Sequence, residues 1–73
     1  MRKEPTAMME TMGQRIRDRR HDKRLKLREL AERIGMSIAH LSLLETGQVE
    51  TRAGLIVRIC HALGVSADWL LGI

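Results

Sequence analysis

The sequence predicts an all-α fold, a compact bundle of five short helices. Apolar residues recur three or four positions apart in successive short stretches, which is the spacing of one face of an α-helix. Glycines that can stop a helix follow three of these stretches, at Gly35, Gly47 and Gly64. Trp69 is the single aromatic residue, so the core is built from aliphatic residues and methionine, a composition that favours helices over sheets. A chain of 73 residues has room for one domain.

Composition and charge divide the chain into unlike parts. Residues 1–10, MRKEPTAMME, carry a proline, mixed charges and no apolar period, so we expect a flexible leader before a folded domain at 11–73. Residues 13–33 hold nine basic and four acidic residues, a net charge of +5, whereas 34–73 carry a net charge of −1. A positive field concentrated at one end suits a surface that meets a polyanion, although a solvated helix face would carry the same charges.

The first helix is expected to begin near Thr11 and to run to about Arg24. Thr11 and Gln14 fit a capping box, in which each side chain accepts a hydrogen bond from the backbone of the other residue. Arg19 interrupts the apolar stripe of this helix. Its aliphatic stem should cover the edge of the core while its charged end stays in water.

Residues 27–46 are predicted to form two short helices joined by a sharp turn. On one face of the first of these helices lie Leu30, Ala31 and Ile34. Gly35 stops this helix, because a residue in the left-handed region is least strained without a Cβ atom. Ser37 is placed to cap the second helix, which is expected at Ile38–Glu45. So short a connection makes the two helices cross steeply, and the pair is a helix-turn-helix.

Two further helices complete the predicted bundle. Thr51 is the expected N-cap of a helix at Arg52–Leu63, which Gly64 ends. Cys60 falls on the apolar side of this helix and is expected to be a small buried hydrophobe. The last helix should follow a cap at Ser66. Three of its residues should cover the core or extend into a dimer contact: Trp69, Leu70 and Leu71.

Two stretches of the chain carry recognisable motifs in order. AERIGMS at 31–37 and LSLLETG at 41–47 match the pattern A-x-x-x-G-x-S followed by L-S-x-[IL]-E-x-G, and ALGVSADWLL follows at 62–71. The chain therefore resembles the phage-repressor-like helix-turn-helix family, of the Cro/cI or XRE type, over about residues 13–71. The resemblance implies a five-helix domain of the lambda-repressor type that binds duplex DNA with its third helix in the major groove.

The resemblance also implies an ion pair between Arg20 in the first helix and Glu45 in the third. Glu45 is expected at a helix C-terminus, where the helix dipole disfavours a carboxylate, so a cationic partner would account for its presence. An exposed surface glutamate is the alternative. The chain departs from the family pattern before the second helix, where Arg24 stands at a usual glycine and Leu27 at a glutamine that binds a phosphate. That phosphate contact is lost.

Base reading and backbone contacts are assigned by the same resemblance. The candidate base contacts are Ile38, Ala39, His40, Ser42 and Leu43. The candidate phosphate contacts are Arg15, Arg17, Lys23, Lys26, Arg28 and Gln48. The first set lacks the amide and guanidinium groups that bind adenine or guanine through two hydrogen bonds. The candidate base contacts can still make apolar contact with thymine methyl groups, hydrogen bonds through Ser42, and a contact of His40 with a phosphate or a base edge. Weak sequence selectivity is therefore expected.

We therefore expect a cytoplasmic, DNA-binding transcription regulator of phage or bacterial origin that acts as a homodimer. The alternative is a protein-interaction module that keeps the fold and binds a partner protein through the apolar surface of its third helix. No enzyme is expected, because the residues supply no nucleophile with a base, no paired carboxylates and no phosphate loop. His21, His40 and His61 lack the spacing of a metal site, so no metal, cofactor or small-molecule ligand is expected. A single cysteine and no membrane-spanning apolar run or signal peptide indicate the cytoplasm.

Overall fold

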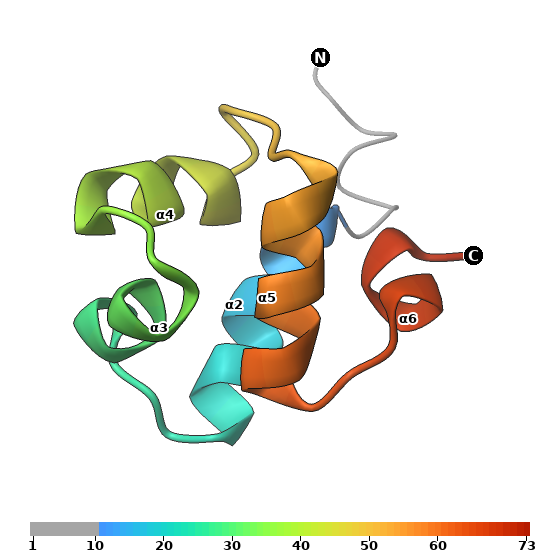
Figure 1. Ribbon diagram of the computed structural model, residues 1–73, viewed down its shortest axis with the longest axis horizontal. Coiled ribbons are helices and arrows are strands. Elements are labelled where there is room, and N and C mark those ends of the chain that lie inside the picture. The colour runs from blue at the N-terminus through green and yellow to red at the C-terminus, as the bar shows by residue number, and fades with distance from the viewer. Residues whose placement is uncertain (1–10) are drawn as a thin grey trace, which may run out of the picture.

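Five helices follow one another in the part of the chain that the computed structural model describes, residues 11–73, and this part holds no strand. They are α2 (Met12–Asp22), α3 (Leu27–Ile34), α4 (Ile38–Glu45), α5 (Ala53–Leu63) and α6 (Ala67–Leu71). α2 and α5 lie together at the centre, with α3 and α4 on one side and α6 on the other (Figure 1). The predicted all-α, five-helix bundle is confirmed. The leader predicted at residues 1–10 lies outside the described residues.

The start of α2 follows from its local sequence. The Thr11 hydroxyl accepts a hydrogen bond from the Gln14 N–H (3.1 Å), and the Gln14 side-chain oxygen accepts one from the Thr11 N–H (3.2 Å), which confirms the predicted capping box. The helix ends at Asp22, two residues earlier than expected. Arg24 has φ +57°, a left-handed conformation that glycine adopts with less strain.

The turn between α3 and α4 forms as predicted. Gly35 has φ +71°, and the N–H of Met36 donates to the carbonyl oxygen of Ala31 (2.9 Å), which satisfies a free C-terminal carbonyl of α3. The Ser37 hydroxyl accepts from the N–H of His40 (3.0 Å) and caps α4. Three residues thus join the two helices, with hydrogen bonds that close the end of α3 and the start of α4.

The start of α5 differs from the prediction. The helix begins at Ala53 and its N-cap is Arg52, which has extended backbone angles and makes no side-chain capping bond. Thr51, the predicted cap, therefore lies one residue too early for its hydroxyl to reach the first turn. The Thr51 hydroxyl oxygen is buried without a hydrogen-bond partner among the described residues. The side chain lines an apolar hollow with Val49 and Leu71.

A core of aliphatic residues fills the space between the helices. Its buried members are Ile16, Leu25, Leu30, Ala31, Ile34, Met36, Leu41, Leu44, Ile59, Cys60, Leu63 and Leu70. Cys60 is buried as predicted, and burial raises the pKa of its thiol, which keeps it in the neutral form. Arg19 is partly buried, and its Nε donates to the carbonyl oxygen of Leu63 (3.2 Å) at the end of α5, a contact that the sequence does not predict.

α6 closes the core through one residue. Ser66 caps this helix as expected, its hydroxyl accepting from the N–H of Trp69 (3.0 Å). Leu70 is fully buried, whereas Trp69 and Leu71 are 43% and 46% exposed. Leu70 therefore covers the core as expected, while Trp69 and Leu71 leave open the alternative of a dimer contact.

Candidate nucleic-acid interface

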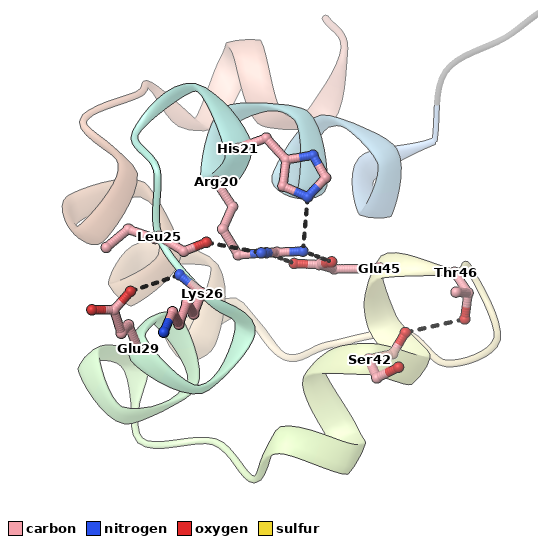
Figure 2. A network of polar contacts seen from close by, with 8 residues as sticks. All are labelled: Arg20, His21, Leu25, Lys26, Glu29, Ser42, Glu45 and Thr46. Atoms are coloured by element: carbon pink, nitrogen blue, oxygen red, sulfur yellow. Dashed lines mark hydrogen bonds and ion pairs between the residues drawn. The ribbon is translucent and has the colours of Figure 1, made fainter.

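A buried ion pair attaches α4 to α2. Arg20 Nε lies 2.8 Å from Glu45 Oε2 and an Arg20 Nη lies 3.0 Å from Glu45 Oε1, while the other Nη donates to the carbonyl oxygen of Leu25 (2.9 Å) (Figure 2). Arg20 and Glu45 are only 8% and 5% exposed. Two parallel charge-assisted bonds fix both distance and orientation. The pair therefore sets the position of α4 and compensates the carboxylate at its C-terminus.

A close approach of the two backbones accompanies this pair. Gly13 in α2 is buried against the last turn of α4. A Cβ atom at this position would overlap the carbonyl oxygen of Leu44 and lie 2.8 Å from that of Glu45. Only glycine permits this contact. No local pattern indicates this contact, because the contacted residues lie about thirty positions further along the chain.

Five side chains form the outward face of α4. Leu41, Leu44 and Glu45 point inward and are buried. The outward face consists of the five predicted base-contact residues, Ile38, Ala39, His40, Ser42 and Leu43, all of them exposed. Ile38 and Leu43 are 42% and 40% exposed, so this face leaves large aliphatic side chains partly in water. The structure therefore presents the predicted set on one surface.

A hollow of about 570 Å³ lies between the start of α3 and the first turn of α4. We call it the α3-side hollow, and it is lined by Lys26, Leu27, Arg28, Glu29 and Ile38. Glu29 Oε1 accepts a hydrogen bond from the N–H of Lys26 (2.7 Å), so this carboxylate satisfies the start of α3 (Figure 2). Two predicted phosphate contacts, Lys26 and Arg28, thus lie beside the predicted base contact Ile38.

A second hollow, of about 530 Å³, lies on the other side of the first turn of α4, between this turn and α5. We call it the α5-side hollow, and it is lined by Gly35, Met36, Ser37, His40, Arg52, Gly54, Leu55 and Arg58. No carboxylate is among these lining residues. Arg58 also donates to the carbonyl oxygen of Ile34 (3.4 Å), which joins α5 to the end of α3. Sequence reasoning missed Arg52 and Arg58, because only the packing of α5 brings them near His40.

The remaining predicted phosphate contacts lie in different places. Gln48 Nε2 donates to the hydroxyl of Thr46 (2.8 Å), just after α4. Arg17 is exposed on α2, one turn after the glycine that contacts α4. Lys23 and Arg15 do not line the α3-side hollow. The end of the Lys23 side chain lies beside Gly64 at the end of α5. The Arg15 guanidinium lies beside Gly72 after α6.

The fold and this surface define the class of the protein. A turn of three residues joins α3 to α4, and α4 is held by a buried ion pair while its other side stays exposed between two hollows. The sequence matches the model of a family described as a helix-turn-helix domain over residues 11–70, which is most of the chain. The protein belongs to this helix-turn-helix family, and the resemblance to its phage-repressor-like, XRE-type members is confirmed.

Solved structures of several regulators are similar to the chain. The P22 c2 repressor in complex with a synthetic operator is 30% identical, with a TM-score of 0.82, and the match covers 86% of this chain and 96% of that one. SinR in complex with DNA is 33% identical, with a TM-score of 0.77, over 82% and 97% of the two chains. The clp gene regulator ClgR from Corynebacterium glutamicum is 42% identical, with a TM-score of 0.77, over 81% of this chain and 63% of ClgR. A search of curated protein sequences finds no match.

Residues 11–73 contain neither a cluster of metal-ligand side chains nor a membrane-spanning helix. No group of three or more histidine, cysteine, aspartate or glutamate side chains in residues 11–73 is arranged to hold a metal ion. None of the described helices has the length and apolar character to cross a membrane.

Proposed function

We propose that this protein is a transcription regulator that binds duplex DNA, with α4 in the major groove. One observation carries the proposal: the outward face of α4 lies between two flanks that carry basic side chains. The major groove of B-DNA admits an α-helix and is bordered on both sides by phosphates. The P22 c2 repressor and SinR, both similar to this chain, have been solved with an operator and with DNA.

Phosphate contacts supply position and most of the affinity in this proposal, and α4 supplies the base contacts. Lys26 and Arg28 are the best-placed phosphate contacts, because they line the hollow that Ile38 also lines. Gln48, just after α4, and Arg17, exposed on α2, extend this set. The candidate base contacts remain Ile38, Ala39, His40, Ser42 and Leu43. A homodimer would place two such surfaces on successive turns of the duplex.

The alternative, a protein-interaction module, is not favoured. Exposed Ile38 and Leu43 would suit a protein partner, but that partner would need acidic side chains facing both flanks of α4. We infer a binding protein and not an enzyme, without a cofactor or a small-molecule ligand. It would act in the cytoplasm, where its DNA target lies.

A salt titration tests the proposal. The affinity of the protein for a labelled, mixed-sequence duplex should fall steeply as salt rises, with log K changing by about 0.9 per log unit of salt for each neutralised phosphate. Lys26→Gln and Arg28→Gln should each lower this slope by roughly one. Arg33→Gln, at the other end of α3, is the matched control and should leave the slope unchanged. An affinity independent of ionic strength would refute DNA binding by this mechanism.

A further inference from the structure

We propose that α4 reads the C5-methyl groups of pyrimidines, so that the protein binds thymine and 5-methylcytosine alike at the positions that α4 faces. The proposal rests on the proposed function, because it assumes that this helix enters the major groove. It goes further by naming the chemical group that carries the sequence information. It also makes the protein sensitive to cytosine methylation.

The centre of the outward face is aliphatic. Ala39 and Leu43 lie one helical turn apart, diametrically opposite the buried side of α4. Ile38 extends the aliphatic surface toward the α3-side hollow. Ile38 and Leu43 are each about two-fifths exposed and leave apolar surface in water in the free protein. Contact with a methyl group in the groove would remove that surface from water.

The polar groups of this face cannot tell one methylated pyrimidine from the other. Thymine and 5-methylcytosine share the C5-methyl group and differ at position 4, where thymine has an oxygen acceptor and cytosine an amino donor. Ser42 carries a hydroxyl, which can donate to the first or accept from the second. His40 is displaced to the flank, where it lines the α5-side hollow with Arg52 and Arg58. The methyl group is therefore the feature that the centre of the face detects.

Charge complementarity selects DNA as the occupant of this apolar surface. Lys26 and Arg28 line the hollow on one flank, and Arg52 and Arg58 line the hollow on the other. The one carboxylate in these two linings, on Glu29, is hydrogen-bonded to the N–H of Lys26 at the start of α3. An apolar strip between two basic margins matches a row of methyl groups between two phosphate backbones.

A set of modified duplexes tests the proposal. A binding sequence is first selected from a randomised duplex pool with the full chain, and it should contain pyrimidine runs rich in thymine. Replacing thymine by uracil in that sequence removes only the methyl group. The dissociation constant at fixed salt should rise about fourfold for each contacted methyl group, the factor expected for one methyl-sized apolar group. Replacing the same thymine–adenine pairs by 5-methylcytosine–guanine pairs should preserve affinity, and unmethylated cytosine should lose the same factor as uracil.

Protein variants locate the effect on α4. Leu43→Ala should reduce the ratio of affinities for the thymine and uracil duplexes toward one, because the variant lacks the side chain that contacts the methyl group. Val57→Ala is the matched control: Val57 is 55% exposed on α5 and lines neither hollow. This control should keep the full ratio.

The outcomes distinguish a failure of methyl reading from a failure of DNA binding itself. Equal affinity for the thymine and uracil duplexes, together with a steep salt dependence, would overturn methyl reading and leave DNA binding intact. Methyl reading would also be overturned if selection from the randomised duplex pool enriched no sequence. If no duplex binds at any salt concentration, both proposals are wrong.

Discussion

The two sides of α4 serve opposite purposes. Its inner side carries Leu41, Leu44 and the ion-paired Glu45, each at most 5% exposed, and a glycine of α2 touches its last turn. Its outer side leaves Ile38 and Leu43 about two-fifths exposed. One helix of eight residues thus has a buried inner side and an aliphatic outer side that is partly exposed to solvent.

This contrast separates stability from recognition. Changes on the inner side should alter the free energy of unfolding, because they leave a buried group without its partner or force backbones apart. Changes on the outer side should alter DNA affinity and leave the free energy of unfolding within about 0.5 kcal/mol. A helix held this rigidly presents its outer side in one orientation, which positions a base-reading surface better than a mobile loop would.

Glu45→Ala should have the largest effect. It leaves the Arg20 guanidinium buried with its Leu25 carbonyl contact but without a counter-charge, and breaking one side of a buried pair costs about 3 kcal/mol or more. For a domain of this size, such a loss should lower the thermal midpoint by more than about 10 °C. Circular dichroism during heating measures it.

Two further variants sharpen this result. Glu50→Ala removes an exposed glutamate just after α4 and should leave the melting temperature nearly unchanged. The double variant Arg20→Ala/Glu45→Ala should lose less than the sum of the two single losses, because the single variants each leave one buried charge unpaired. A shift near zero for Glu45→Ala would show that the pair contributes nothing to stability.

Gly13→Ala should have the next largest effect. The added Cβ atom would overlap the carbonyl oxygen of Leu44, so α4 must move away from α2 at a cost of about 2 kcal/mol. Gly54→Ala is a matched control in α5, where a Cβ atom meets nothing within 4 Å, and it should stabilise the helix by about 0.5 kcal/mol. Urea denaturation of each variant measures the change in the free energy of unfolding, which should be a loss for Gly13→Ala and a gain for Gly54→Ala. A stabilised Gly13→Ala would mean that the two backbones are not in contact.

Sequence reasoning succeeded where structure depends on near neighbours. The capping box at Thr11, the stop at Gly35 and the cap at Ser37 each involve residues within four or five positions, and all formed as predicted. The pairing of Arg20 with Glu45 spans 25 residues. It was inferred from the family resemblance and from the unfavourable position of a carboxylate at a helix end.

Three features could not be predicted from the sequence. Thr51 had the right residue type for a cap, but the extended backbone of Arg52 starts α5 one residue later. The basic lining of the α5-side hollow joins His40 to residues 12 and 18 positions further on, and no local pattern encodes that distance. Trp69, Leu70 and Leu71 are expected to cover the core or to extend into a dimer contact, and only Leu70 is buried. The last two outcomes were decided by how the helices pack.

Arg24→Gly should have the smallest effect, and it should be stabilising. Arg24 holds φ +57° in the turn that presents the Leu25 carbonyl to Arg20, and glycine relieves the strain of that conformation by about 0.5–1 kcal/mol, after its greater chain entropy is counted. Arg24→Asn should stabilise less, since asparagine tolerates this region better than arginine. Lys23→Gly, at φ −88°, should not stabilise at all. If Arg24→Gly leaves the melting temperature unchanged, the turn is not strained. If it changes the thymine-to-uracil affinity ratio, the inner contacts and the outer face of α4 are not as independent as their packing indicates.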